Sequence, residues 1–259
     1  MKDVSLLIMS CDKYADLWKP FFHLLFYYWP ELPFPVYLLS NHRIYPDGRV
    51  RPLAVGEDRS WSHGLLAAIG KIDTPLVLCM LEDFFLQEPV DQEAISNCLR
   101  MMEETDAGMM RLVPNPRPDL PIDGYPEIGE IAISSPYRVS TQATLWRKSE
   151  LHRVVKAGES IWEFEINGTE RSRSFDNGYY CVWKGVMRYI HVIERGKWFR
   201  RQARKYAAMG IGCDFSRRPV MTRKETLLWH GSWLLSHPKK LFSWQLRQKV
   251  KKMLQVSSS

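Results

Sequence analysis

The sequence lacks several features by which common classes of protein are recognised. Its five cysteines form no Cys-x-x-Cys pair, which argues against a zinc site or a disulfide framework and favours a reducing compartment. No apolar run reaches the roughly 18 residues that a membrane-spanning helix needs. The dinucleotide motif G-x-G-x-x-G, the P-loop G-x-x-x-x-G-K-[ST], the G-x-S-x-G elbow and H-E-x-x-H are all missing. These absences argue against a dinucleotide cofactor, a P-loop enzyme, a serine hydrolase of that type and a zinc protease.

The composition is that of a globular protein. The chain has 259 residues, of which 45% are hydrophobic and 12% aromatic, enough for one sizeable domain with a full core or for one domain with an appendage. Met1, Lys2 and Asp3 lead directly into a strand-like run, so we expect no signal peptide and a cytoplasmic protein. Strand motifs typical of RNA-binding domains are absent, and no nucleic-acid partner is expected.

Strand and helix patterns alternate along the first two thirds of the chain. Strands are expected over residues 4–9, 36–40, 76–81 and 108–113, and helices over 14–28, 62–71 and 91–102. A proline- and glycine-rich stretch at 114–136 indicates a long ordered loop, after which a strand over 139–146 and a helix over 148–156 follow. This alternation predicts an α/β domain with a mostly parallel central sheet that is flanked by helices.

The stretch from Leu76 to Leu81 is the strongest indication of a ligand site. Six consecutive apolar residues predict a strand buried on both faces, and Glu82 and Asp83 follow it directly. Carboxylates at the end of a buried strand are costly unless a metal, a cation or a polar ligand meets them. Ligands of open α/β sheets bind at this edge. A helix cap or a structural ion pair would also explain the two carboxylates.

A second cluster of carboxylates lies between residues 158 and 173. Glu159, Glu163 and Glu165 alternate there with Trp162. If the segment is helical, Glu159 and Glu163 share a face at i, i+4 and repel each other unless a ligand, a cation or an acid–base role separates them. A carboxylate beside an indole suits the deprotonation of a hydroxyl group. A solvated helix face with packed aromatic stems is the alternative.

The net charge of +7 is concentrated near the C-terminus. Six lysines and arginines and no acid lie between Arg195 and Lys205, and eight stand against the single acid Glu225 between residues 223 and 252. This asymmetry indicates an acidic partner, either an anionic membrane surface, such as the inner face of the cell membrane, or a polyanion. Helical packing onto the preceding α/β domain with a solvated basic face is the alternative. The predicted interfacial helix combines tryptophans and cations, namely Trp229, Trp233, Trp244, Lys239, Lys240, Arg247, Lys249, Lys251 and Lys252.

The order of several motifs resembles one family. Between residues 4 and 198 the chain is similar to bacterial glycosyltransferases of GT-A fold, and more narrowly to the small ones encoded with polysaccharide and O-antigen assembly genes. The resemblance implies a GT-A-like catalytic domain over 1–198 and leaves a basic helical extension over 199–259. It also implies transfer of a sugar from a nucleotide-diphosphate donor, a UDP-sugar, to a hydroxyl of a glycan or lipid-linked acceptor. The motifs are S-C-D-K-Y, S-W-S-H-G-L, L-E-D-F-F-L, Y-R-V-S-T-Q-A-T-L-W-R and E-S-I-W-E-F-E-I-N-G-T-E-R-S.

The resemblance further assigns roles to single residues. In this family an acidic D-x-D-type motif holds a divalent metal, Mn²⁺ or Mg²⁺, on the diphosphate, and Asp83 with His191 would be the ligands here. Phe84 stands where the second aspartate is expected, which leaves metal dependence open. The catalytic base would be Glu165, with Glu163 second. The acceptor contacts would be Trp162 and Gln142, and the donor contacts Ser10, Asp12, Ser62, Glu82, Asp83 and Lys197.

Some alternatives remain open at this stage. His191 could be a hydrogen-bonded core imidazole, and Lys197 a solvated surface charge. A sugar nucleotidyltransferase would share the fold, but the glycine- and lysine-rich loop of such enzymes after the first strand is replaced by S-C-D-K-Y. A non-catalytic, membrane-associated subunit of polysaccharide assembly is the third hypothesis.

Overall fold

A computed structural model describes residues 3–236, with side chains described through Trp229. The chain forms two compact units, one of residues 1–192 with 210–214 and the other of residues 193–209 with 215–259. We describe each unit by itself.

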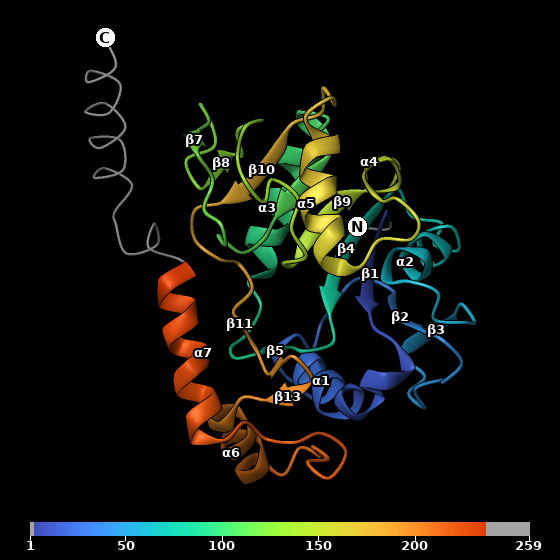
Figure 1. The fold of residues 1–259 in the computed structure, drawn as a ribbon. Helices are drawn as coiled ribbons and strands as arrows, with labels where there is room; N and C mark the ends of the chain where they lie inside the picture. The colour runs from blue at the N-terminus through green and yellow to red at the C-terminus, as the bar shows by residue number, and fades with distance from the viewer. Residues whose placement is uncertain (1–2, 237–259) are drawn as a thin grey trace. The chain divides into compact units, whose positions relative to one another are not determined.

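The first unit is built on one sheet whose nine strands have the order β3-β2-β1-β4-β9-β6-β10-β8-β7 (Figure 1). Parallel pairing joins β1 to β2 and β4, β2 to β3, and β6 to β10. β9 runs antiparallel between β4 and β6, and β8 is antiparallel to β10 and β7. The predicted α/β fold with a mostly parallel sheet is confirmed. The strands are β1 Val4–Met9, β2 Val36–Ser40, β3 Val50–Ala54, β4 Leu76–Leu81, β6 Met109–Arg111, β7 Leu120–Pro121, β8 Ile128–Glu130, β9 Thr144–Arg147 and β10 Tyr179–Val182.

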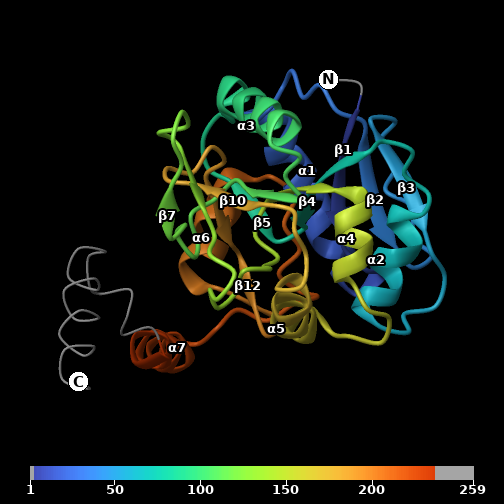
Figure 2. The same cartoon turned by 90° about the horizontal axis from the view of Figure 1, so that it is seen from above.

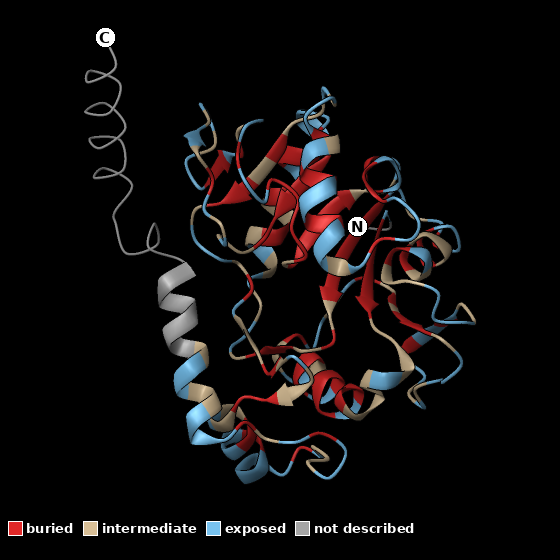
Figure 3. Ribbon diagram, in the orientation of Figure 1, coloured by how far each residue is buried: buried red, intermediate tan, exposed pale blue. Residues whose placement is uncertain are grey.

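Strands β1 and β4 are buried because helices cover both faces of the sheet. Every residue of β1 and the first five of β4 are buried, as the apolar runs predict (Figure 3). Figure 2 shows α3 on one side of the sheet and α2, α4 and α5 on the other. The helices of this unit are α1 Ala15–Tyr28, α2 Trp61–Ile69, α3 Gln92–Glu104, α4 Lys148–Val154 and α5 Ile161–Ser172, and a 3₁₀ turn over Asp12–Tyr14 precedes α1.

Some elements were not expected from the sequence. β3 contains Pro52, which spoils a strand pattern, but β3 is an edge strand, where a missing N–H is tolerated. The loop at 114–136 holds the short strands β7 and β8. The strand expected over 139–146 begins only at Thr144, so residues 139–143 are irregular. Two further strands, β5 Phe84–Leu86 and β11 Tyr189–His191, pair antiparallel in a separate sheet.

The second unit contains a short hairpin and two helices. β12 Ile193–Glu194 pairs with β13 Lys197–Trp198 across Arg195 and Gly196, both at positive φ. Helices α6 Arg200–Met209 and α7 Arg223–Ser236 follow. Among the described residues, no helix is long and apolar enough to cross a membrane. The rest of the predicted interfacial helix lies outside the residues whose side chains are described: Trp233, Trp244, Lys239, Lys240, Arg247, Lys249, Lys251 and Lys252.

Candidate active site

The carboxyl ends of β1 and β2 are joined by the side chain of Asp12. Its Oδ1 accepts hydrogen bonds from the backbone N–H groups of Asn41 (3.0 Å) and Arg43 (3.2 Å), and its Oδ2 accepts one from His42 (3.1 Å). The Asp12 N–H donates to Asn41 Oδ1 at 3.0 Å. Ser10 Oγ accepts from Trp18 Nε1 at 2.8 Å. Asp12 thus shapes the loop at the edge where ligands of such sheets bind, and its contact with a donor stays a prediction.

The acidic pair follows β4 at the same edge. Glu82 is buried, with 6% of its surface exposed, and Asp83 Oδ2 lies 3.9 Å from His191 Nδ1. His191 reaches this position because β11 pairs with β5, which places it opposite Phe84. The backbone N–H of Val192 also donates to the Asp83 carbonyl at 3.1 Å. Phe84, which stands where the motif would have its second aspartate, is therefore part of β5, and the pairing of β5 with β11 places His191 beside Asp83.

His191 is suited to act as a metal ligand together with Asp83. Partial desolvation by the surrounding protein lowers the pKa of His191, which favours the neutral ring that keeps a lone pair for a metal. Its side chain is 44% exposed, so a ligand can reach it. Two donor atoms that bind the same ion at about 2.0–2.2 Å lie roughly 3–4 Å from each other. The 3.9 Å between Asp83 Oδ2 and His191 Nδ1 falls within this range. The described residues contain no cluster of three or more such groups, so other ligands would have to complete a site.

Glu163 caps the start of α5. Glu163 Oε2 accepts from the N–H (2.8 Å) and the hydroxyl (2.7 Å) of Ser160, while Ser160 Oγ accepts from the Glu163 N–H, which is a capping box. These hydrogen bonds lower the pKa of the exposed Glu163 carboxyl. The capping box by itself accounts for a carboxylate at this position, and the predicted catalytic role of Glu163 stays a prediction.

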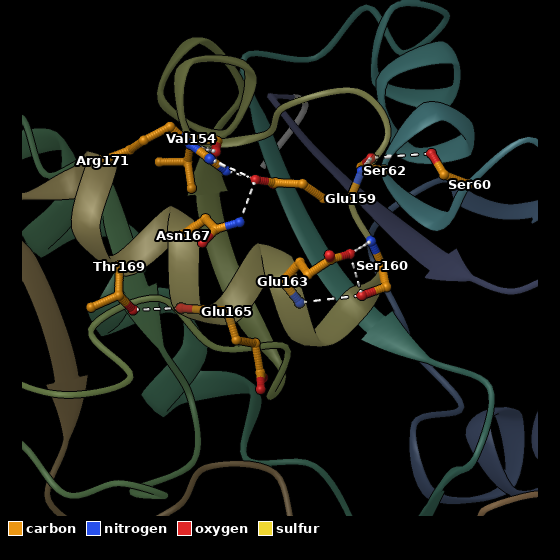
Figure 4. A network of polar contacts seen from close by, with 10 residues as sticks. All are labelled: Ser60, Ser62, Val154, Glu159, Ser160, Glu163, Glu165, Asn167, Thr169 and Arg171. Atoms are coloured by element: carbon orange, nitrogen blue, oxygen red, sulfur yellow. Dashed lines mark hydrogen bonds and ion pairs between the residues drawn. The ribbon is translucent and has the colours of Figure 1, made fainter.

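Glu159 lies before the helix, because α5 begins only at Ile161. The expected pairing of Glu159 with Glu163 on one helix face is therefore wrong. Glu159 instead forms a two-pronged ion pair with Arg171, at 2.7 and 2.6 Å, and accepts from Asn167 Nδ2 at 3.0 Å (Figure 4). Burial raises the pKa of Glu159, but the hydrogen bonds from Arg171 and Asn167 outweigh it and leave the pKa below its usual value. This carboxylate is structural.

Glu165 points to a different side of α5 from Glu159 and Asn167 (Figure 4). The residue is 8% exposed, and its Oε1 accepts from the backbone N–H (2.7 Å) and the hydroxyl (2.8 Å) of Thr141. No described residue donates a hydrogen bond to Oε2. One oxygen is thus held in place while the other remains available to take a proton, as a general base requires. Trp162 lies one turn earlier on α5 and is 68% exposed.

A chain of contacts runs from Glu165 to the neighbour of Asp83. Thr141 is held by Glu165, and the next two residues are held by Tyr189, whose hydroxyl donates to Gln142 Oε1 (2.8 Å) and accepts from the Ala143 N–H (3.0 Å). The ring of Tyr189 stacks on Phe84 with centroids 4.3 Å apart. We call residues 141–143 the bridging segment. It connects the carboxylate of α5 with the acidic end of β4.

Arg111 supports the residues that precede the bridging segment. Its side chain is fully buried and donates to the carbonyls of Pro116 (3.0 Å), Tyr137 (2.7 Å) and Arg138 (2.9 Å). Burial lowers the pKa of this guanidinium, and the negative charge of Glu165 opposes that shift. Such a buried cation is costly, and the three carbonyls offset part of the cost. These hydrogen bonds hold the irregular backbone that precedes the bridging segment in one conformation.

The structure does not place Ser62 where a donor could reach it. Ser62 is fully buried, its hydroxyl accepts from the Glu159 N–H at 2.9 Å, and its own N–H donates to the Glu159 carbonyl at 3.1 Å. The predicted donor contact is therefore not met, because both polar groups of Ser62 tie α2 to the start of α5.

A hollow of about 10 Å³ beside Ser140, Thr141 and Gln142 has room for about one water molecule and not for a sugar ring.

Lys197 belongs to the second unit and forms an ion pair with Glu225 at 2.5 Å. Its predicted contact with a donor phosphate stays a prediction.

Three residues that matter to this site were not predicted from the sequence: Thr141, Tyr189 and Arg111. A signal existed only for Tyr189, which stands two residues before His191 on a strand and therefore shares its face. Thr141 and Arg111 act through an irregular segment, where no periodicity reveals a contact.

No family model and no curated protein matches the sequence. Among solved structures the chain is similar to S. aureus TarS in complex with UDP-GlcNAc, with 13% identity, a TM-score of 0.44, and 70% of this chain and 58% of that chain covered. The galactosyltransferase LgtC in complex with donor and acceptor sugar analogues matches with 14% identity, a TM-score of 0.38 and 61% of each chain covered. The bifunctional IspDF from Campylobacter jejuni matches with 12% identity, a TM-score of 0.42, and 73% of this chain and 52% of that chain covered. The chain thus spans less than two thirds of the length of each of these proteins.

Proposed function

We propose that this protein transfers a sugar from a nucleotide-diphosphate donor, a UDP-sugar, to a hydroxyl of a glycan or lipid-linked acceptor in surface polysaccharide biosynthesis. The observation that carries the proposal is the contact chain from Glu165 through the bridging segment and Tyr189 to Phe84 and Asp83. It joins a carboxylate that can act as a base to an acidic pair at the ligand-binding edge of the sheet.

The donor side of the reaction needs stabilisation of negative charge. Cleavage of the anomeric bond leaves a nucleotide diphosphate, and a divalent cation, Mn²⁺ or Mg²⁺, supplies electrostatic stabilisation to such a leaving group when it is bound. Asp83 and His191 are the residues that would hold this ion, because their donor atoms are 3.9 Å apart and the lowered pKa of the histidine favours its neutral, metal-binding form. Glu82 adds negative charge beside them. Oxygens of the diphosphate would complete the coordination.

The acceptor side needs a base and a means to orient the hydroxyl. Glu165 takes the proton of the attacking hydroxyl on Oε2, while Thr141 holds Oε1 and keeps the carboxylate from rotating. Trp162, exposed one turn before Glu165, offers an apolar face to a sugar ring. Gln142 offers an amide for hydrogen bonds to sugar oxygens. A base that activates the acceptor directly fits a reaction with inversion at the anomeric carbon.

Binding to nucleotide sugars tests the proposal directly. We expect a UDP-sugar to raise the melting temperature in a thermal-shift screen of UDP-, GDP-, CMP- and dTDP-sugars, with a larger rise when Mn²⁺ is present. A ligand at about 100 times its Kd stabilises by about 2.7 kcal/mol, which corresponds to several degrees. Release of UDP during turnover distinguishes transfer from a nucleotidyltransferase, which would release or consume pyrophosphate. A protein that no nucleotide sugar stabilises, and that releases no nucleotide, would contradict the proposal.

The second unit supports a place at an anionic membrane surface, the inner face of the cell membrane. Leu227 and Leu228 are 72% and 63% exposed on α7, beside an excess of cations. Apolar side chains next to basic ones are typical of interfacial binding. In residues 193–209 and 215–236 the only acids are Glu194 and Glu225, against Arg195, Lys197, Arg200, Arg201, Arg204, Lys205, Arg217, Arg218, Arg223 and Lys224.

Vesicle flotation measures this membrane contact. The protein should float with vesicles that contain phosphatidylglycerol and not with pure phosphatidylcholine, and binding should weaken as salt is added. Each basic residue near such a surface contributes about 1 kcal/mol, so Arg201→Gln with Arg204→Gln should weaken binding by about 30-fold. Arg49→Gln with Arg51→Gln, two cations of the first unit, is the matched control. Equal binding to neutral and anionic vesicles would refute an electrostatic membrane contact.

A further inference from the structure

Tyr189 lies between the acidic end of β4 and the bridging segment, and its hydroxyl makes two hydrogen bonds to that segment. We propose that Tyr189 is a positioning residue that locks the side-chain amide of Gln142, so that Gln142 Nε2 can only donate hydrogen bonds away from Tyr189, to an oxygen of the acceptor substrate. The proposal rests on the proposed function, since it names the group of the acceptor that the site recognises.

The direction of each hydrogen bond follows from what the partners can do. The Ala143 N–H can only donate, so at 3.0 Å the phenol oxygen of Tyr189 must accept. The phenol has one proton, and Gln142 Oε1 at 2.8 Å is the acceptor within reach. If the amide were turned round, Nε2 would face the phenol, and the phenol proton would have no acceptor among the described residues. An unmet donor of this kind is costly, so the carbonyl oxygen of Gln142 faces Tyr189.

The phenol is itself held firmly by its surroundings. Its ring stacks on Phe84 with an interplanar angle of 6°, and pairing of β11 with β5 places Tyr189 opposite Leu86. A fixed donor of this kind determines the orientation of the amide that receives its proton.

Two adjacent residues of the bridging segment therefore have complementary roles: Thr141 holds the carboxylate of Glu165, and Gln142 presents its amide N–H groups. In the described part of the chain no hydrogen bond uses Gln142 Nε2, while Thr141 next to it holds Glu165. An acceptor alcohol needs a base for its proton and donors for its remaining oxygens. Glu165 Oε2 would be the base, and the two N–H groups of the Gln142 amide would be the hydrogen-bond donors. The inferred ligand is therefore a hydroxyl, ring or carbonyl oxygen of the acceptor sugar.

A double-mutant cycle separates positioning from a general structural effect. Tyr189→Phe removes only the hydroxyl and keeps the stack on Phe84, and Gln142→Ala removes the amide. The assay follows UDP release from the UDP-sugar found in the screen, with methyl glycosides as acceptors. We expect each variant to raise KM for the glycoside about tenfold, with KM for the donor unchanged, and the double variant to show no further increase, because Tyr189 acts through Gln142.

A second measurement tests the orientation without any turnover. With ¹⁵N-labelled glutamine, the side-chain N–H₂ signals of Gln142, assigned through their loss in Gln142→Ala, should be those of an immobilised amide and should move to free-amide positions in Tyr189→Phe. The matched control is Tyr179→Phe, which removes the hydroxyl that donates to Glu150 Oε1 at 2.9 Å in the core and should change neither these signals nor KM for the glycoside.

Each outcome has a defined meaning. Additive effects of the two substitutions, an unchanged KM for the glycoside in Tyr189→Phe, or Gln142 signals that do not move would overturn the role of Tyr189. Failure of the proposed function looks different, because the wild-type protein would then bind no nucleotide sugar. In that case the Gln142 signals alone decide whether Tyr189 locks the amide.

Discussion

Replacement of Asp83 by asparagine is expected to abolish sugar transfer and leave the protein folded. Asparagine has almost the same shape but no charge, so the proposed site would lose the charge that we expect to contribute most to metal and diphosphate binding. The backbone of Asp83 would keep its hydrogen bond from Val192, because that bond uses the carbonyl oxygen. We expect kcat to fall by about 10³-fold or more, as is typical when one strong electrostatic contact of a transition state is removed.

Two measurements support this test. The stabilisation of the wild-type protein by Mn²⁺ with UDP should disappear in Asp83→Asn, as seen by thermal shift. Glu88→Gln is the matched control, because Glu88 is a half-exposed carboxylate just past β5 that pairs with the exposed Arg188 at 3.1 Å. That variant should transfer sugar like the wild type. Full activity of Asp83→Asn would remove the acidic end of β4 from the mechanism.

Glu165→Gln should lower kcat by about 10²–10⁴-fold with donor binding preserved. The amide oxygen of glutamine can still accept both hydrogen bonds from Thr141, so the side chain keeps its position and loses only its ability to take a proton. UDP release with saturating acceptor measures kcat, and thermal shift with the UDP-sugar measures donor binding. Loss of both together would indicate a damaged fold.

Two other glutamates of α5 complete this test. Glu170→Gln is the matched control, since Glu170 is exposed on the same helix and its carboxylate pairs, among the described residues, with Arg173 at 2.6 Å. Glu163→Gln weakens the capping box, and loss of a helix cap costs about 1 kcal/mol of stability. If Glu163→Gln stopped transfer and Glu165→Gln did not, the base would have to be reassigned to Glu163.

The order and position of the main elements could be predicted from the sequence because local pattern decides them. The apolar run from Leu76 to Leu81 can be satisfied only inside a sheet that is covered on both faces, and β4 has these bounds. The same holds for β1 and β2. Asp83 is placed at the ligand-binding edge by the same reasoning, since it comes directly after a parallel strand.

The roles of the glutamates near Trp162 could not be predicted in this way. Glu159, Glu163 and Glu165 have the same chemistry and lie within seven positions of one another, yet one pairs with Arg171, one caps the helix and one contacts Thr141. The difference arises because α5 starts at Ile161, a boundary that Ser160 sets through its cap.

The sequence alone therefore determined the sheet, the buried strand and the acidic pair at its end, because apolar burial acts on contiguous residues. The tertiary structure decided which residues meet that pair. His191 reaches Asp83 through strand pairing over more than one hundred positions, and Tyr189 reaches Gln142 through a side-chain hydrogen bond to an irregular segment. Contacts of this kind depend on where distant segments pack, and no local periodicity encodes them.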